Sequence, residues 1–138
     1  MANKIYSPQE ISQELDAQLP AINKGSSIPV PKELAMALLM VENMDKDGNV
    51  SFQNAVSTKG AQGVGQVMPD TIRLLKKASF LPADFPEDLR DAPVRQQVQA
   101  SLAAVKELVT RLKTTDPDKI GANYNASPRA TQKFMETG

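Results

Sequence analysis

The stretch Val94–Lys113, VRQQVQASLAAVKELVTRLK, is the clearest helical pattern in the chain. Its apolar residues recur at steps of three and four: Val98, Leu102, Val105, Val109 and Leu112. This spacing places them on one face of a helix. We therefore expect a long amphipathic helix that packs along most of the domain.

Three other segments carry helix signals. Ser7-Pro8-Gln9-Glu10 combines a serine cap, a proline at the first helical position and a glutamate three residues after the cap, which predicts a helix over 8–19 that Pro20 closes. Residues 31–43, PKELAMALLMVEN, are apolar around most of a helical circumference, so this helix belongs in the centre of the domain. A short helix is expected from Pro69 to about Ala78, with basic residues in its last turn.

The remaining segments are irregular or short. Residues 24–30 and the proline-rich stretch 82–93 are predicted to be loops. Short helices are predicted from Pro117 and from Pro128, the latter capped by Ser127. Only a short extended piece at 50–52 interrupts this pattern. The 138 residues suit a single domain, and its fold class is all-α or nearly so.

Composition excludes several classes of function. The 16 Lys and Arg residues balance the 16 Asp and Glu residues, so no global field attracts nucleic acid or an anionic membrane surface. The chain has no Cys and no His, which excludes disulfides, thiol nucleophiles, Ser-His-Asp triads and nearly every zinc or haem site. No apolar run reaches the length of a bilayer span, and the N-terminus lacks the apolar core of a signal peptide. We expect no cofactor and no membrane insertion.

The glycine-rich stretch 60–71, GAQGVGQVMPDT, is the most unusual loop of the chain. A phosphate loop needs a preceding strand and a Lys-Ser or Lys-Thr pair after its last glycine, whereas Gln66-Val67 follows Gly65. Its apolar residues also argue against a solvated linker. We therefore expect a tight loop whose glycines let the backbone approach a ligand or another element closely.

A second loop imitates half of a calcium-binding hand. Asp45, Asp47 and Asn49 supply oxygens at alternate positions, as Ca²⁺ requires. However, Val50 stands where the turn glycine belongs, and Val56 where the bidentate glutamate belongs. The pattern favours a turn that binds no metal. The alternative is a calcium site formed by Asp45, Asp47 and Asn49.

Two polar positions stand out for chemistry. Glu42 ends the apolar helix, where desolvation can raise the pKa of its carboxyl and make it a general acid. The alternative is a helix-end glutamate that points to water or pairs with a lysine. Tyr124-Asn125 can offer a ring face and hydrogen bonds to a sugar, or Tyr124 can simply pack between helices.

Taken in order, these pieces resemble the catalytic domain of soluble lytic transglycosylases of the Slt type, whose fold is lysozyme-like and helical. The resemblance covers most of the chain beyond residue 28 and rests on these blocks: Ile28–Pro31, the apolar helix ending in Glu42, Asn54–Ser57, Lys59–Ala61, Gly63–Pro69, Thr71 and Asn123–Pro128. It implies a domain over residues 28–138, preceded by an N-terminal helix and linker over 1–27 that forms one compact unit with it.

The resemblance implies a function and a set of site residues. Glu42 would be the catalytic acid and then base that cleaves the bond between N-acetylmuramic acid and N-acetylglucosamine in peptidoglycan, forming a 1,6-anhydro sugar. The substrate-binding residues would be the following: Ser57, Gln66, Met68, Tyr124 and Asn125. The partner would be the glycan strands of peptidoglycan in the bacterial cell wall or periplasm. The chain would reach them as part of a phage particle, together with other domains or proteins of that particle, or by another translocation route.

The sequence departs from the family pattern at named positions. Asn43 stands in place of the usual serine after the glutamate, Ser127 in place of a glycine, and Gly65 in place of a bulky residue. The missing side chain at Gly65 predicts a wider groove there. Two alternatives remain: a goose-type muramidase that hydrolyses the same bond, and a non-catalytic lysozyme-like module that binds glycan or builds a larger assembly.

Overall fold

The computed structural model describes residues 3–124, which fold into helices and one small sheet. The helices are α1 (Pro8–Asn23), α2 (Lys32–Glu42), α3 (Pro69–Lys77), α4 (Val94–Leu112) and α5 (Pro117–Tyr124), and the strands are β1 (Ile5–Tyr6) and β2 (Phe52–Gln53). The prediction of a mostly helical fold is confirmed. The helix expected at Ser127 and Pro128 lies outside the described residues. Within them, no helix is both long and apolar enough to cross a membrane.

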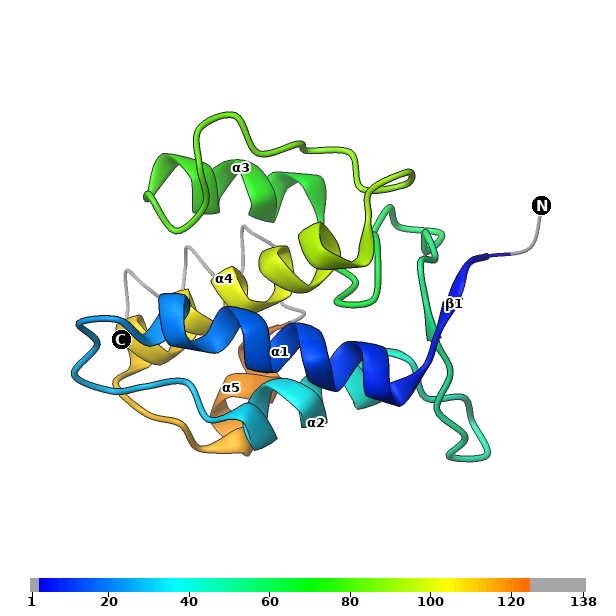
Figure 1. Cartoon of the computed structure of the whole chain (residues 1–138), viewed down its shortest axis with the longest axis horizontal. Coiled ribbons are helices and arrows are strands. Elements are labelled where there is room, and N and C mark those ends of the chain that lie inside the picture. Colours follow the sequence, from blue (N-terminus) through cyan, green and yellow to red (C-terminus); the bar gives the residue numbers. More distant parts are fainter. Residues whose placement is uncertain (1–2, 125–138) are drawn as a thin grey trace.

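Helix α4 is the central element of the fold. It contacts α1, α2, α3 and α5, and Figure 1 shows α3 on one side of it and α2 with α5 on the other. Its large apolar residues, including Val98 and Leu102, pack in a core with α1 and α2. Its small residues Ala100, Ala103 and Ala104 face a second core, made with α3 and the connector that follows it. The predicted long helix is confirmed, and it divides the interior in two.

Helix α1 extends beyond its predicted end. The predicted cap is present, since the Glu10 N–H donates to Ser7 Oγ and the Ser7 N–H donates to Glu10 Oε1, both at 3.1 Å. However, Pro20 lies inside the helix, which continues to Asn23. A proline inside a helix removes one backbone hydrogen bond and costs about 3 kcal/mol.

Tertiary contacts hold the last turn of α1 beyond that proline. The Asn23 side chain donates to the Val30 carbonyl at 3.0 Å and accepts from the Val30 N–H at 2.7 Å. Ile22 also packs against the first core. Because these contacts come from the loop that leads to α2, the sequence pattern around Pro20 does not reveal them.

The sheet was only partly anticipated. The strand lies at Phe52–Gln53 rather than 50–52, and it pairs antiparallel with β1, which was not predicted. Tyr6 lies opposite Phe52, and both side chains are buried. Strands of two residues are too short to show the alternation of apolar and polar residues by which strands are recognised.

The central role of α4 predicts a large effect of one core truncation. Leu102 is 1 % exposed in the first core, so Leu102→Ala should lower the free energy of unfolding by about 2–5 kcal/mol through lost burial and a cavity. Leu74 on α3 is 48 % exposed, and Leu74→Ala should change it by about 0.5 kcal/mol or less. Urea unfolding followed by circular dichroism measures both, and equal effects would contradict the central position of α4.

Candidate functional site

A cleft of about 200 Å³ opens at the C-terminal end of α2. Its walls come from α2, the loop over 57–68, α3, α4 and α5, through these residues: Glu42, Ser57, Lys59, Ala61, Gln66, Val67, Met68, Thr71, Ala104 and Tyr124. Glu42, Ser57, Gln66, Met68 and Tyr124 were all expected in the site from the sequence. The structure brings these five together, whereas Asn125 lies outside the described residues.

Glu42 is the carboxylate of this cleft. It is the last residue of α2 and is half-buried. Val67 and Ala104 supply apolar surface to the same cleft, and both are buried. The position of Glu42 therefore agrees with the expectation that it faces the glycine-rich loop at the end of an apolar helix.

Asn43 ties the end of α2 to that loop. Its Nδ2 donates to the Leu39 carbonyl at 2.7 Å and to the Val64 carbonyl at 2.8 Å, and its Oδ1 accepts from the Gln53 N–H at 3.1 Å. An asparagine side chain offers two donors and an acceptor, and all three functions are used here. A serine has only one hydroxyl and cannot make this set of bonds. Asn43 thus fixes the backbone next to Glu42.

Gln97 of α4 holds the same loop from the opposite side, and sequence reasoning missed it. It is fully buried; its Oε1 accepts from the Val64 N–H at 3.0 Å, and its Nε2 donates to Tyr6 Oη at 3.0 Å and to the Ala92 carbonyl at 2.9 Å. The available signal was a pair of uncharged polar residues, Gln97 and Ser101, spaced four apart in the amphipathic helix. Such a pair shares one helix face.

Gly63 and Gly65 allow the loop to come into close contact with α4. A Cβ atom on Gly65 would lie 2.6 Å from Ser101 Cβ and 2.9 Å from Tyr124 Oη. A Cβ atom on Gly63 would lie 3.1 Å from Gln97 Cγ, and Gly63 has φ +77°. The predicted wider groove at Gly65 is therefore wrong, because Ser101 and Tyr124 fill the space that a side chain would take.

Tyr124 completes this contact through its hydroxyl. The hydroxyl donates to the Gly65 carbonyl at 2.8 Å, so at the 2.6 Å contact with Ser101 the serine is the donor. Burial raises the pKa of Tyr124 far above its usual value, the Ser101 hydrogen bond lowers it, and the charge of Glu42 raises it further. The hydroxyl of Tyr124 thus binds the loop, and the partly buried ring of Tyr124 lines the cleft.

Ser57 and Gln66 also shape the loop. Ser57 Oγ accepts from the Ala61 N–H at 3.0 Å, which leaves the hydroxyl hydrogen to donate elsewhere. Gln66 has the unusual φ of +50°, and its Nε2 donates to the Ala55 and Gly63 carbonyls, both at 2.9 Å. The amide donors that we expected to bind a ligand are therefore used to fold the loop.

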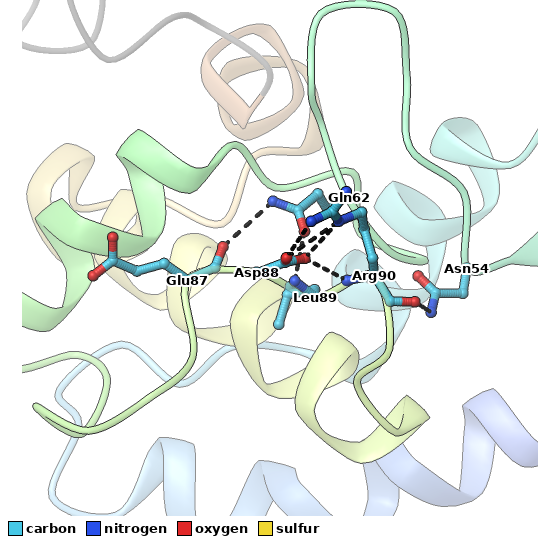
Figure 2. Close-up of polar contacts among 6 residues, drawn as sticks. All are labelled: Asn54, Gln62, Glu87, Asp88, Leu89 and Arg90. Atoms are coloured by element: carbon cyan, nitrogen blue, oxygen red, sulfur yellow. Dashed lines mark hydrogen bonds and ion pairs between the residues drawn. The ribbon is translucent and has the colours of Figure 1, made fainter.

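Gln62 anchors the outer side of the loop to the connector before α4 (Figure 2). Its side chain accepts from the Leu89 N–H and donates to the Glu87 carbonyl. Next to it, Arg90 binds Asp88 through two guanidinium nitrogens and lowers the pKa of Asp88 to about 2. Asn54 Nδ2 donates to the Arg90 carbonyl at 2.9 Å. This network keeps the loop and the connector together.

The Asp45 loop forms a tight turn, and its residues do not line the cleft. Asp45 Oδ1 accepts from the N–H groups of Asp47 and Asn49, both at 2.9 Å. These bonds, led by that from Asn49, lower the pKa of Asp45. In the part of the chain that the structure describes, no group of three or more Asp, Glu, His or Cys residues is placed to hold a metal ion.

Comparison of the chain with protein-family models, with curated proteins and with solved structures finds no match in any of the three. The residues of the cleft and their geometry are therefore the basis for inferring a function.

The close packing at Gly65 predicts that even a methyl group there is harmful. Gly65→Ala should lower the free energy of unfolding by about 1–3 kcal/mol, because Ser101 and Tyr124 must move away. Gly121→Ala is the matched control: its Cβ would lie 3.9 Å from Leu38 Cδ2, and alanine favours the helix by about 1 kcal/mol. Thermal and urea unfolding compare the two variants, and an unaffected Gly65→Ala protein would refute this packing.

The raised pKa of Tyr124 predicts a loss of stability in alkali. Above about pH 10 the unfolded chain loses the tyrosine proton, whereas the folded chain keeps it. The unfolded state is then favoured as the pH rises, so stability falls. Tyr124→Phe should show a smaller fall between about pH 9 and pH 11 than the unmutated chain. Urea unfolding at each pH tests this, and identical slopes would show that Tyr124 ionises freely in the folded protein.

Proposed function

We propose that this chain is a peptidoglycan lytic transglycosylase domain with a lysozyme-like fold, and that Glu42 is its catalytic acid and base. The observation that carries the proposal is the joint position of Glu42, Ser57, Gln66, Met68 and Tyr124 around one cleft. Glu42 and Tyr124 come from helices that are separate in sequence from the loop over 57–68, which supplies the other three residues. If the resemblance of these short sequence blocks were due to chance, their residues would not be expected to line the same cleft.

The cleft suits a mechanism with a single carboxylate. Among the ten residues that line it, Glu42 is the sole acidic one. Retaining and inverting glycosidases generally use a pair of carboxylates. In a transglycosylase, the acetamido carbonyl of the substrate stabilises the anomeric carbon instead, and one protein carboxylate suffices.

The reaction then proceeds in two proton transfers. Protonated Glu42 gives its proton to the glycosidic oxygen as the bond from that oxygen to C1 of the muramoyl sugar breaks. Glu42, now a carboxylate, takes the proton of the muramoyl 6-hydroxyl, and the oxygen of that hydroxyl bonds to C1. The product is a 1,6-anhydro sugar, Glu42 is protonated again, and no water is consumed.

The loop would position the glycan beside Glu42. The hydroxyl hydrogen of Ser57 can donate to a sugar, and the ring of Tyr124 and the side chain of Met68 offer apolar surface. Lys59, to which we assigned no role from the sequence, adds the cleft's positive charge. Gln66 acts through the loop that its amide folds.

The departures from the family pattern at Asn43 and Gly65 are the features that favour the alternative of a non-catalytic module. Both residues have a structural explanation, since Asn43 binds Val64 and Gly65 packs against Ser101. Neither departure removes the carboxylate or closes the cleft. The catalytic reading is therefore the better supported of the two.

Analysis of the products tests the reaction and the residue together. Purified cell wall treated with the chain should yield anhydro-muropeptides, identified by mass spectrometry. Glu42→Gln keeps the shape of the side chain but cannot donate or accept the proton, so product release should fall by at least about a hundredfold. Glu33→Gln is the matched control, because Glu33 is exposed in the first turn of the same helix.

Three other outcomes would contradict the proposal. Products with ordinary reducing ends would identify a hydrolase of the goose type. Glycan binding without turnover would identify a binding module. An unchanged rate in Glu42→Gln, with a normal circular dichroism spectrum, would move the chemistry to another residue.

A further inference from the structure

A second pocket, of about 570 Å³, lies apart from the Glu42 cleft and shares none of its lining residues. It is formed by the loop after α1, the C-terminal half of α4 and one residue of the connector after α3, through the following side chains and backbone: Lys24, Gly25, Ser26, Ser27, Ile28, Phe80, Lys106, Thr110 and Lys113. We call it the lysine pocket.

The lysine pocket concentrates positive charge in a chain that is neutral overall. Lys24, Lys106 and Lys113 line it, and no carboxylate does. Within residues 3–124, none of these three lysines forms an ion pair with a carboxylate. Three ammonium groups without carboxylate partners favour a bound anion.

The other groups of the pocket suit an anion with an organic part. Lys106 Nζ donates to Ser26 Oγ, which joins α4 to the loop after α1. Ser27 and Thr110 add hydroxyls that can donate to an oxygen. Phe80 and Ile28 supply apolar surface. A pocket lined by both hydrogen-bond donors and apolar atoms matches a charged group attached to carbon.

The helix dipole explains only part of this arrangement. Lys24 and Lys113 are the C-caps of α1 and α4, where positive charge offsets the partial negative charge of the helix end. Lys106 lies two turns before the end of α4, beyond the reach of that effect. The hydroxyls and the apolar wall are not accounted for by the dipole either.

We propose that the lysine pocket binds the phosphate group of an organic phosphate ester. Lysine is a frequent phosphate ligand because its ammonium is a compact charge with three donors. The ester could be a small molecule or one unit of a polyol-phosphate polymer. This site is independent of Glu42 and of the proposed reaction.

Titration with glycerol 3-phosphate tests the site. Calorimetry at low salt should show saturable binding, and the amide resonances of Gly25, Ser26 and Thr110 should shift. Lys106→Gln should weaken the affinity about tenfold, because one charged hydrogen-bond donor is lost. Lys77→Gln, an exposed lysine of α3 outside the pocket, should leave it unchanged.

Lys24→Gln with Lys113→Gln provides a second test at exposed positions, should Lys106→Gln unfold the chain. Tighter binding of poly(glycerol phosphate) per phosphate than of the monomer would identify a polymer as the source, and equal binding a small ester. Both results support the site. Absence of saturable binding, shifts confined to other residues, or equal affinity in both lysine variants and the unmutated chain would overturn it.

Discussion

The two hydrogen bonds to the backbone of Val64 are the contacts on which the site depends. Asn43, at the end of α2, binds its carbonyl, and Gln97, in α4, binds its N–H. Val64 is completely buried, so an unpaired N–H or carbonyl there would cost about 1–3 kcal/mol. The pair therefore fixes the glycine-rich loop between two helices and sets its position relative to Glu42.

Helix α4 serves both the core and the site because its faces differ in size and polarity. Large apolar residues such as Leu102 fill the first core, whereas Ala104 allows α3 and the loop to approach. Gln97 binds the loop at Val64, and Ser101 binds the Tyr124 hydroxyl, which in turn binds the Gly65 carbonyl. The stability of the core and the geometry of the cleft thus depend on the same helix.

Local signals in the sequence were sufficient for most helices, whereas Ser57, Gln66 and Met68 were expected in the cleft only from the family resemblance. Proline and serine caps located the starts of α1 and α3, and apolar spacing located α4. Glu42 was singled out by its place after an apolar run. The continuation of α1 through Pro20 and the strand β1 escaped prediction, because contacts with residues distant in sequence stabilise both.

The sequence by itself determined the helical pattern, the absence of Cys and His chemistry and the candidate carboxylate. Only the tertiary structure decided what the glycines and the polar residues do. From the sequence we expect open space where Gly65 lacks a side chain, yet Ser101 and Tyr124 occupy that space. The physical reason is that the spacing of residues along the chain shows which of them lie on the same face of a helix. It does not show which atoms of another segment pack against that face.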